Sequence, residues 1–147
     1  MAFTFLQNYL IFATVLLLYN TYKDLKKMEV DSRFNFMASG ALVMLIFYFS
    51  PSFLRILIPI IISSITVAFF AWRKFYASGD LEAVAWVLVA LGIMDYIRMI
   101  IFLVLLTAFY TFGLIMLKLT KRTDNKLPGY PSILGSFILS IISFAFL

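Results

Sequence analysis

The stretch "LEAVAWVLVALGIMDYIRMIIFLVLLTAFYTFGLIML", Leu81 to Leu117, decides the fold, because its 37 residues include only three charged ones. As a single helix rising about 1.5 Å per residue, it would be about 55 Å long, nearly twice the thickness of a bilayer's hydrocarbon core. The chain must therefore turn, and the polar cluster "GIMDYIR", Gly92 to Arg98, is the place for the turn. This predicts two membrane helices, at about 81–96 and 97–117.

The rest of the chain has the same character. Hydrophobic residues make up 64% of it and charged residues 13%, whereas an average soluble domain is about 25% charged. Four more apolar segments, at 3–22, 34–50, 53–72 and 130–147, are long enough for membrane helices, which need about 17–25 residues. The sequence therefore predicts an all-α integral membrane protein, with residues 1–147 forming a single polytopic domain of six transmembrane helices.

The basic residues predict the orientation of these helices. The loops after the first, third and fifth segments carry ten Lys and Arg residues, whereas the loops after the second and fourth carry only Arg55 and Arg98. By the positive-inside rule the first set faces the cytoplasm, so both termini are expected to be extracytoplasmic in a multi-pass protein of the cell membrane. The net charge of +5 is explained by this topology rather than by nucleic-acid binding.

The chain contains neither cysteine nor histidine, so any acid–base chemistry depends on its five Asp and two Glu, or on Tyr and Lys. Asp24 follows the first segment and Asp80 opens the fourth, which places both at the cytoplasmic face. Two carboxyl groups that meet in a partly dry site share one proton, as in aspartic proteases. The ionised group then activates a water molecule while its protonated partner polarises the scissile carbonyl.

Simpler interpretations are favoured for each residue taken alone. Asp80 in "SGD", with Glu82 two residues later, is typical of a helix N-cap. Asp24 stands among lysines and is explained by local charge pairing. A further alternative is a small proton-coupled transporter or channel subunit that uses Asp80 or Asp95 as its proton site.

Together the two sites resemble the type IV prepilin peptidase family, in particular its short archaeal branch of six-helix, GxGD-class intramembrane aspartyl proteases. The segment "KDLKKMEVDSRFNF", Lys23 to Phe36, is similar to the first family motif, with Asp24 at the catalytic position. The segment "ASGD", Ala77 to Asp80, is similar to the GxGD motif, with alanine in place of its first glycine. The segment "LPGYPSILGSF", Leu127 to Phe137, resembles the proline-containing start of the family's last helix.

This resemblance implies a membrane endopeptidase that removes the short basic leader of prepilin or preflagellin (archaellin) precursors at the cytoplasmic face. Its partners would be that substrate and the lipid bilayer, and it implies no metal, organic cofactor or nucleic acid. It assigns catalysis to Asp24 and Asp80, an active-site loop to Ala77, Ser78 and Gly79, and attraction of the leader to Glu29, Asp31 and Glu82. Charge balance among neighbouring lysines is an equal explanation for Glu29 and Asp31. A non-catalytic relative that binds pilin-like helices also fits, because the family often has lysine at the position of Glu82.

Overall fold

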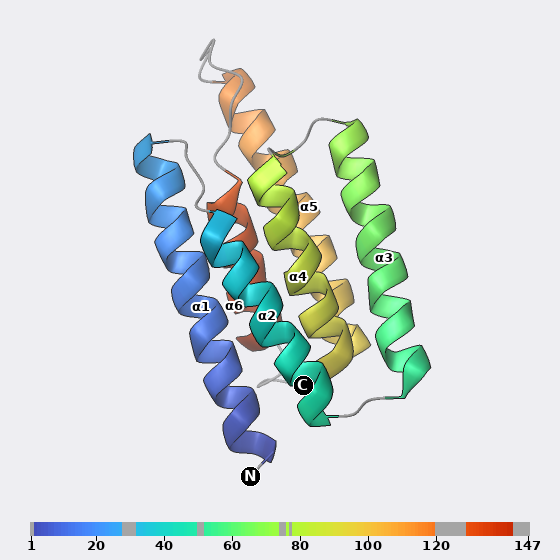
Figure 1. The fold of residues 1–147 in the computed structure, drawn as a ribbon. Helices are drawn as coiled ribbons and strands as arrows, with labels where there is room; N and C mark the ends of the chain where they lie inside the picture. The colour runs from blue at the N-terminus through green and yellow to red at the C-terminus, as the bar shows by residue number, and fades with distance from the viewer. Residues whose placement is uncertain are drawn as a thin grey trace.

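The computed structural model describes residues 2–27, 32–49, 52–73, 76, 78–119 and 129–142. Six α-helices run through them, and these residues include no β-strand (Figure 1). The helices are α1 (Ala2–Lys27), α2 (Ser32–Phe49), α3 (Phe53–Trp72), α4 (Ser78–Met94), α5 (Tyr96–Leu119) and α6 (Tyr130–Ile142). For the described residues, the prediction of an all-α fold with six helices is confirmed.

The helix bounds follow the apolar segments with two instructive differences. Helix α3 has the predicted bounds, and the break between α4 and α5 falls at Asp95, within the predicted turn. Helix α1 continues past the predicted end at residue 22, so that Asp24 lies on a helix rather than beyond one. Helix α4 begins at Ser78 instead of Leu81. The last five residues of the predicted segment 130–147 lie outside the described residues.

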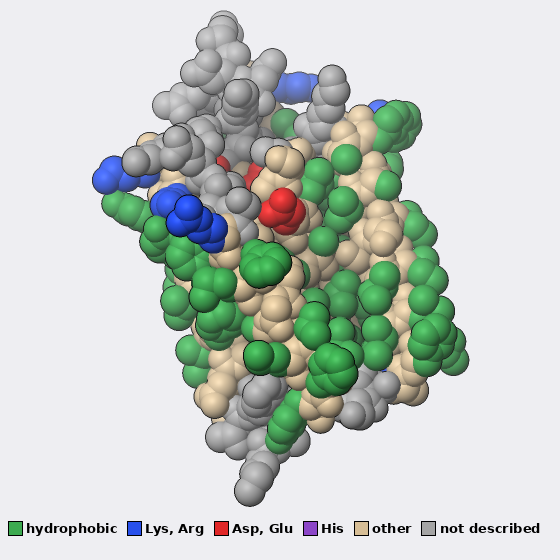
Figure 2. Space-filling model, in the orientation of Figure 1, with side chains coloured by type: hydrophobic (Ala, Val, Ile, Leu, Met, Phe, Trp, Pro, Cys, Tyr) green, Lys and Arg blue, Asp and Glu red, His purple; other side chains and the backbone are tan. Residues whose placement is uncertain are grey.

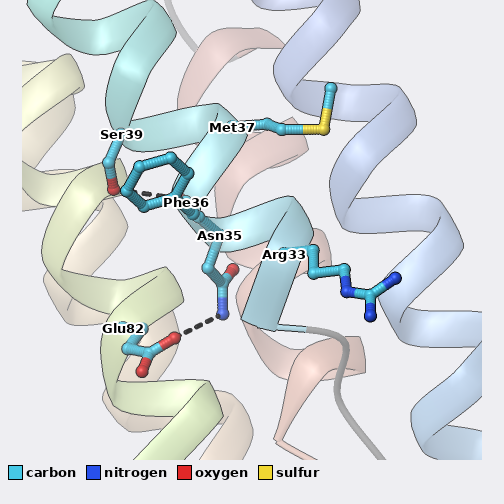
Figure 3. A pocket seen from close by; sticks show the side chains of 6 residues that line it. All are labelled: Arg33, Asn35, Phe36, Met37, Ser39 and Glu82. Atoms are coloured by element: carbon cyan, nitrogen blue, oxygen red, sulfur yellow. Dashed lines mark hydrogen bonds between the residues drawn. The ribbon is translucent and has the colours of Figure 1, made fainter.

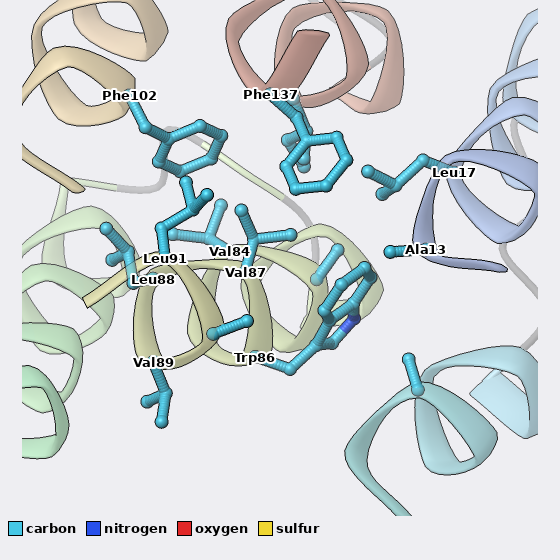
Figure 4. Packing of buried hydrophobic residues seen from close by; sticks show 14 of the residues in the cluster. Ala13, Leu17, Val84, Trp86, Val87, Leu88, Val89, Leu91, Phe102 and Phe137 are labelled. Carbon is cyan, nitrogen blue, oxygen red and sulfur yellow. The ribbon is translucent and has the colours of Figure 1, made fainter. Parts of the chain in front are cut away.

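Helix α4 is the centre of the bundle, where it packs against α2, α3, α5 and α6 (Figure 1). A helix that is apolar on all sides is typical of such a buried position. Figure 4 shows Val87 and Leu91 of α4 among Leu17 of α1, Phe102 of α5 and Phe137 of α6, and all five side chains are buried. This core holds the first turn of α4 in a defined place relative to α1 and α6.

Helices α3 and α4 approach each other closely at a glycine. A methyl group built on Gly92 would lie 2.6 Å from both Cβ and Cγ of Pro59, so no larger residue fits there without movement of one helix. Two hydrogen bonds accompany this contact: the Ser63 hydroxyl donates to the Ala85 carbonyl at 3.2 Å, and the Arg55 guanidinium donates to the Met94 carbonyl at 3.1 Å. These contacts hold α3 against one side of α4.

The helices run alternately up and down, so three helix ends and three helix starts meet at one end of the bundle (Figure 1). The ends of α1, α3 and α5 and the starts of α2, α4 and α6 lie at the top of Figure 1, which we call the upper end. Asp24 near the end of α1 and Asp80 at the start of α4 both belong to the upper end.

Two helical stretches, Phe53–Trp72 and Tyr96–Met116, are long and apolar enough to cross a membrane. Only 17% of each is buried within the bundle, whereas the core helix of a soluble protein is mostly buried. Shorter apolar helices cover Arg33–Tyr48 and Tyr130–Ile142. Figure 2 shows hydrophobic side chains spread over the described surface on one face of the bundle. Soluble monomers rarely expose large contiguous apolar patches, so this surface points to an association with membranes.

Candidate active site

Asp24 and Asp80 are both buried at the upper end, with 5% and 4% of their surface exposed. Asp80 is the third residue of α4, inside its first turn, whereas an N-cap residue precedes the first turn. The interpretation of Asp80 as an N-cap is therefore wrong, although an acidic side chain in the first turn still interacts favourably with the helix dipole. Buried carboxyl groups are costly, so both positions require partners.

The start of α6 brings the two carboxyl groups to one place. The backbone N–H of Tyr130 donates a hydrogen bond to Oδ2 of Asp24 at 3.1 Å. A methyl group built on the preceding residue, Gly129, would lie 2.5 Å from Cγ of Asp80 and 2.8 Å from Cδ1 of Tyr76. Asp24 and Asp80 are 56 residues apart in the sequence, yet they touch adjacent residues of the same backbone segment. Only glycine allows this approach to Asp80.

Burial changes the acidity of this site. It raises the pKa of Asp24, and hydrogen bonds from the backbone N–H groups of Tyr130 and Gly129 oppose that effect only in part. The pKa of Tyr76 is also raised, first by burial and then by its interactions with Tyr110 and Asp80, so its phenol stays neutral at neutral pH. A carboxyl group that retains its proton more readily than an exposed one, at a buried position, is a candidate for acid–base chemistry.

A buried polar network surrounds the side chain of Tyr130. Its hydroxyl donates to Oδ1 of Asn35 at 2.8 Å and accepts from Nδ2 of Asn20 at 3.3 Å. The indole Nε1 of Trp86 donates to the same Asn35 oxygen at 3.3 Å. The four residues come from α6, α2, α1 and α4. Networks of satisfied buried polar groups fix the relative position of the elements that contribute them.

Asn35 also holds the first turn of α4. Its Nδ2 donates to the carbonyl of Gly79 at 3.1 Å and to Oε2 of Glu82 at 3.2 Å, the second of which is drawn in Figure 3. Ser78 and Gly79, which were expected to form an active-site loop, instead lie within this helical turn. The helix begins early because Asp80 suits its positive end and Asn35 binds its backbone. Ala77, Glu29 and Asp31 lie outside the described residues.

Sequence reasoning missed most of this network. Asn20 lies four residues before Asp24, hence on the same helix face, and a polar residue there within an apolar segment could have been recognised. Asn35 at the start of the second apolar segment carries a similar signal. Tyr130 is one of eight tyrosines, and nothing but its place in "LPGYPSILGSF" distinguishes it.

The remaining acids that the structure describes have separate surroundings. Glu82 is exposed and lines a cavity of about 600 Å³ at the upper end, together with Arg33, Asn35, Phe36, Met37 and Ser39 (Figure 3). Asp95 lies at the opposite end of α4, where its Oδ1 accepts the backbone N–H of Ile97 at 3.0 Å. Asp95 thus has a local role at the start of α5, remote from the two buried carboxyl groups.

Comparison with known proteins finds no protein family, no curated protein and no solved structure that matches this chain.

Proposed function

We propose that this protein is a membrane aspartic endopeptidase that removes the short basic leader of type IV prepilin-like or preflagellin precursors. One observation carries the proposal: two buried carboxyl groups, Asp24 of α1 and Asp80 of α4, meet at the same dipeptide, Gly129–Tyr130. The chain has no histidine or cysteine, so a carboxyl pair is its best candidate for acid–base chemistry. The resemblance of the two surrounding motifs to the prepilin peptidases supplies the substrate class.

In this proposal the bundle spans the cell membrane six times, with its upper end in the cytoplasm and both termini outside. The exposed apolar sides of α3 and α5 support it, since they suit contact with lipid. Aromatic and basic side chains at the upper end also support it: the guanidinium of Arg73 lies 4.8 Å from the ring centre of Trp72, and Lys23 lies 5.2 Å from that of Tyr19. Such pairs are typical of the cytoplasmic membrane interface.

The chemistry assigns one role to each member of the pair. The ionised carboxyl group takes a proton from a water molecule as the water oxygen attacks the scissile carbonyl carbon, and the protonated group donates a hydrogen bond to the carbonyl oxygen. The carboxyl group that took the proton from water then delivers it to the leaving nitrogen as the C–N bond breaks. The raised pKa of Asp24 favours the singly protonated pair that this cycle needs.

The backbone at the start of α6 covers the two carboxyl groups. Gly129 and Tyr130 lie against the two carboxyl groups, and both acids are almost inaccessible to water. A peptide bond that is to be cut must therefore take the place of this backbone segment, which requires a shift of the start of α6. Shielding a reactive pair until substrate arrives is a common use of movable segments in enzymes.

The test is a cleavage assay in membranes or detergent with a precursor that carries a basic leader, read out as the mass of the product. Asp24→Asn and Asp80→Asn keep the shape of the side chains but cannot share a proton, so each should lower kcat at least about a thousandfold. Asp95→Asn is the matched control, because asparagine also caps a helix start, and it should retain wild-type activity.

Full cleavage by either dyad variant would refute the peptidase mechanism, as would a folded wild-type protein that never cuts. In the second case a proton-flux assay with Asp80→Asn becomes the next experiment, since a buried acid also suits a proton pathway.

A further inference from the structure

A groove runs along α4 between α2 and α3. Both helices pack on α4, and the space between them holds a second cavity of about 310 Å³ that shares Ser39 and Glu82 with the 600 Å³ cavity. Glu82, Trp86 and Val89 lie along its floor at helical spacing, so the groove follows one stripe of α4. We call this space, from Asn35 and Glu82 at the upper end to Val89, the α2–α3 groove.

The walls of the groove suit a helix from another polypeptide. Ser39, Ser63 and Ser64 line it, and each hydroxyl donates to a backbone carbonyl of its own or the adjacent helix. The serines therefore offer short side chains without free donors. Small residues of this kind let two helix backbones approach closely within a membrane. Apolar side chains such as Ile60 and Phe36 border the opening.

Glu82 makes a purely apolar occupant unfavourable. It is the one carboxylate among the described residues that line the groove, and Asn35 holds its Oε2 at 3.2 Å. An apolar helix laid over this charge would bury it without a counter-charge, which is unfavourable. A lysine or arginine at the upper end of the occupant removes that cost. Arg33 is the one cation among the described residues that line the two cavities, and Figure 3 shows its side chain pointing away from Glu82.

We propose that the α2–α3 groove receives the apolar helix of the precursor sideways from the bilayer, and that Glu82 binds a basic residue at the cytoplasmic end of that helix. This inference rests on the proposed peptidase function and adds the docking surface. Glu82 and Asp80 are two residues apart on α4 and therefore face different sides of the helix. The leader must then cross the first turn of α4, over the exposed Ser78 and the side-chain-free Gly79, to reach the carboxyl pair.

Site-specific photo-crosslinking tests the docking surface without requiring cleavage. A photoreactive phenylalanine analogue replaces Ser64 in the groove or, as the matched control, Thr111, which lines a cavity of about 630 Å³ formed by α5. Both positions are exposed, and both proteins also carry Asp80→Asn to retain the precursor. Crosslinks to the apolar helix of the precursor should form from position 64 and not from position 111. Crosslinks from position 111 alone, or from neither position, would overturn the proposal.

A charge exchange tests the role of Glu82. Glu82→Gln keeps an oxygen acceptor for Asn35, so with a lysine-bearing precursor it should raise KM about tenfold with little change in kcat. With that precursor, Glu82→Lys should raise KM further than Glu82→Gln does. Its KM should return toward the wild-type value when the lysine of the precursor is replaced by glutamate. A merely structural role of Glu82 would give no such recovery, and that result would overturn the assignment.

The experiments distinguish a failure of the proposed peptidase function from a failure of the proposed docking groove. If the variant with the analogue at position 64 crosslinks but the wild-type protein cuts nothing, the groove stands and the peptidase function falls. If the wild-type protein cuts the precursor while crosslinks form only from the variant with the analogue at position 111, the peptidase function stands and the groove falls.

Discussion

Gly129 lies where any side chain would collide with the carboxyl group of Asp80, and the next residue donates its backbone N–H to Asp24. One glycine and one amide thus bring together two acids that come from different helices. The positive end of the α6 dipole also points at this place, which reduces the cost of a negative charge there. In the proposed mechanism a single charge shared by the two acids would be better accommodated here than two.

The buried state of Asp24 predicts a pH-dependent stability. Because its pKa is higher in the folded protein than in the unfolded chain, the folded protein binds more protons over the interval between the two values. The free energy of unfolding should therefore fall as pH rises through that interval, which begins near the ordinary aspartate value of about 4. Thermal unfolding in detergent between pH 4 and 7 should show a steeper decline for wild type than for Asp24→Asn.

The difference between these two curves reports Asp24 together with its coupling to Asp80, since two interacting acids titrate as a pair. Parallel curves would contradict the raised pKa of Asp24. A decline that is steeper in the variant would contradict its sign.

At the level of helices, Tyr130 secures α6 to three neighbours. Its hydroxyl lies between Asn35 of α2 and Asn20 of α1, and Asn35 in turn binds α4. Tyr130→Phe removes one hydrogen bond from each of two buried amides, so it should lower the free energy of unfolding by about 1–3 kcal/mol. It should also lower cleavage activity, because the start of α6 positions both acids. Chemical unfolding in detergent and the cleavage assay measure the two effects.

Tyr19→Phe is the matched control for this prediction. Tyr19 is exposed, and its contacts with Phe34 and Lys23 use the ring rather than the hydroxyl. It should change the free energy of unfolding by less than about 0.5 kcal/mol, as surface substitutions usually do. If the two variants behaved alike, the hydroxyl of Tyr130 would have no part in holding α6.

Hydropathy predicted the helices well but not where each one ends. It placed all six helices and the turn at Asp95, because long apolar segments are the strongest pattern in the chain. It ended the first segment at residue 22, although "YKDLKK" continues α1 to Lys27. Hydropathy marks where polar residues begin, whereas a helix continues as long as its backbone geometry and neighbours support it.

The candidate site was predicted only in part, because most of its contacts join segments that are far apart in the sequence. The sequence placed Asp24 and Asp80 at the same end, which the alternation of helices requires. It did not place them at Gly129, nor Asn35 beside Gly79, because these contacts depend on how α6 and α2 pack on α4. Contacts between residues that are 44 to 110 positions apart leave no local pattern in a single sequence.

The distribution of charge over the whole molecule predicts how the bundle is oriented in the membrane. The upper end carries Asp24, Asp80 and most of the basic side chains that the structure describes, and Figure 2 shows acidic and basic groups gathered toward it on the visible face. With the upper end in the cytoplasm, Lys26 near the end of α1 would lie inside the cell and Ser52 before α3 outside. Both residues are exposed, and the chain has no cysteine of its own.

Single-cysteine labelling can therefore be read without background. Ser52→Cys should react with a membrane-impermeant maleimide in intact cells, whereas Lys26→Cys should react only after the cells are opened. The wild-type chain, which offers no thiol, is the control for other labelled proteins. The reverse pattern would put the carboxyl pair on the outer face, where it could not meet a precursor leader still in the cytoplasm. Because the sequence predicts ten basic residues after the first, third and fifth apolar segments and two after the second and fourth, the positive-inside rule favours the first pattern.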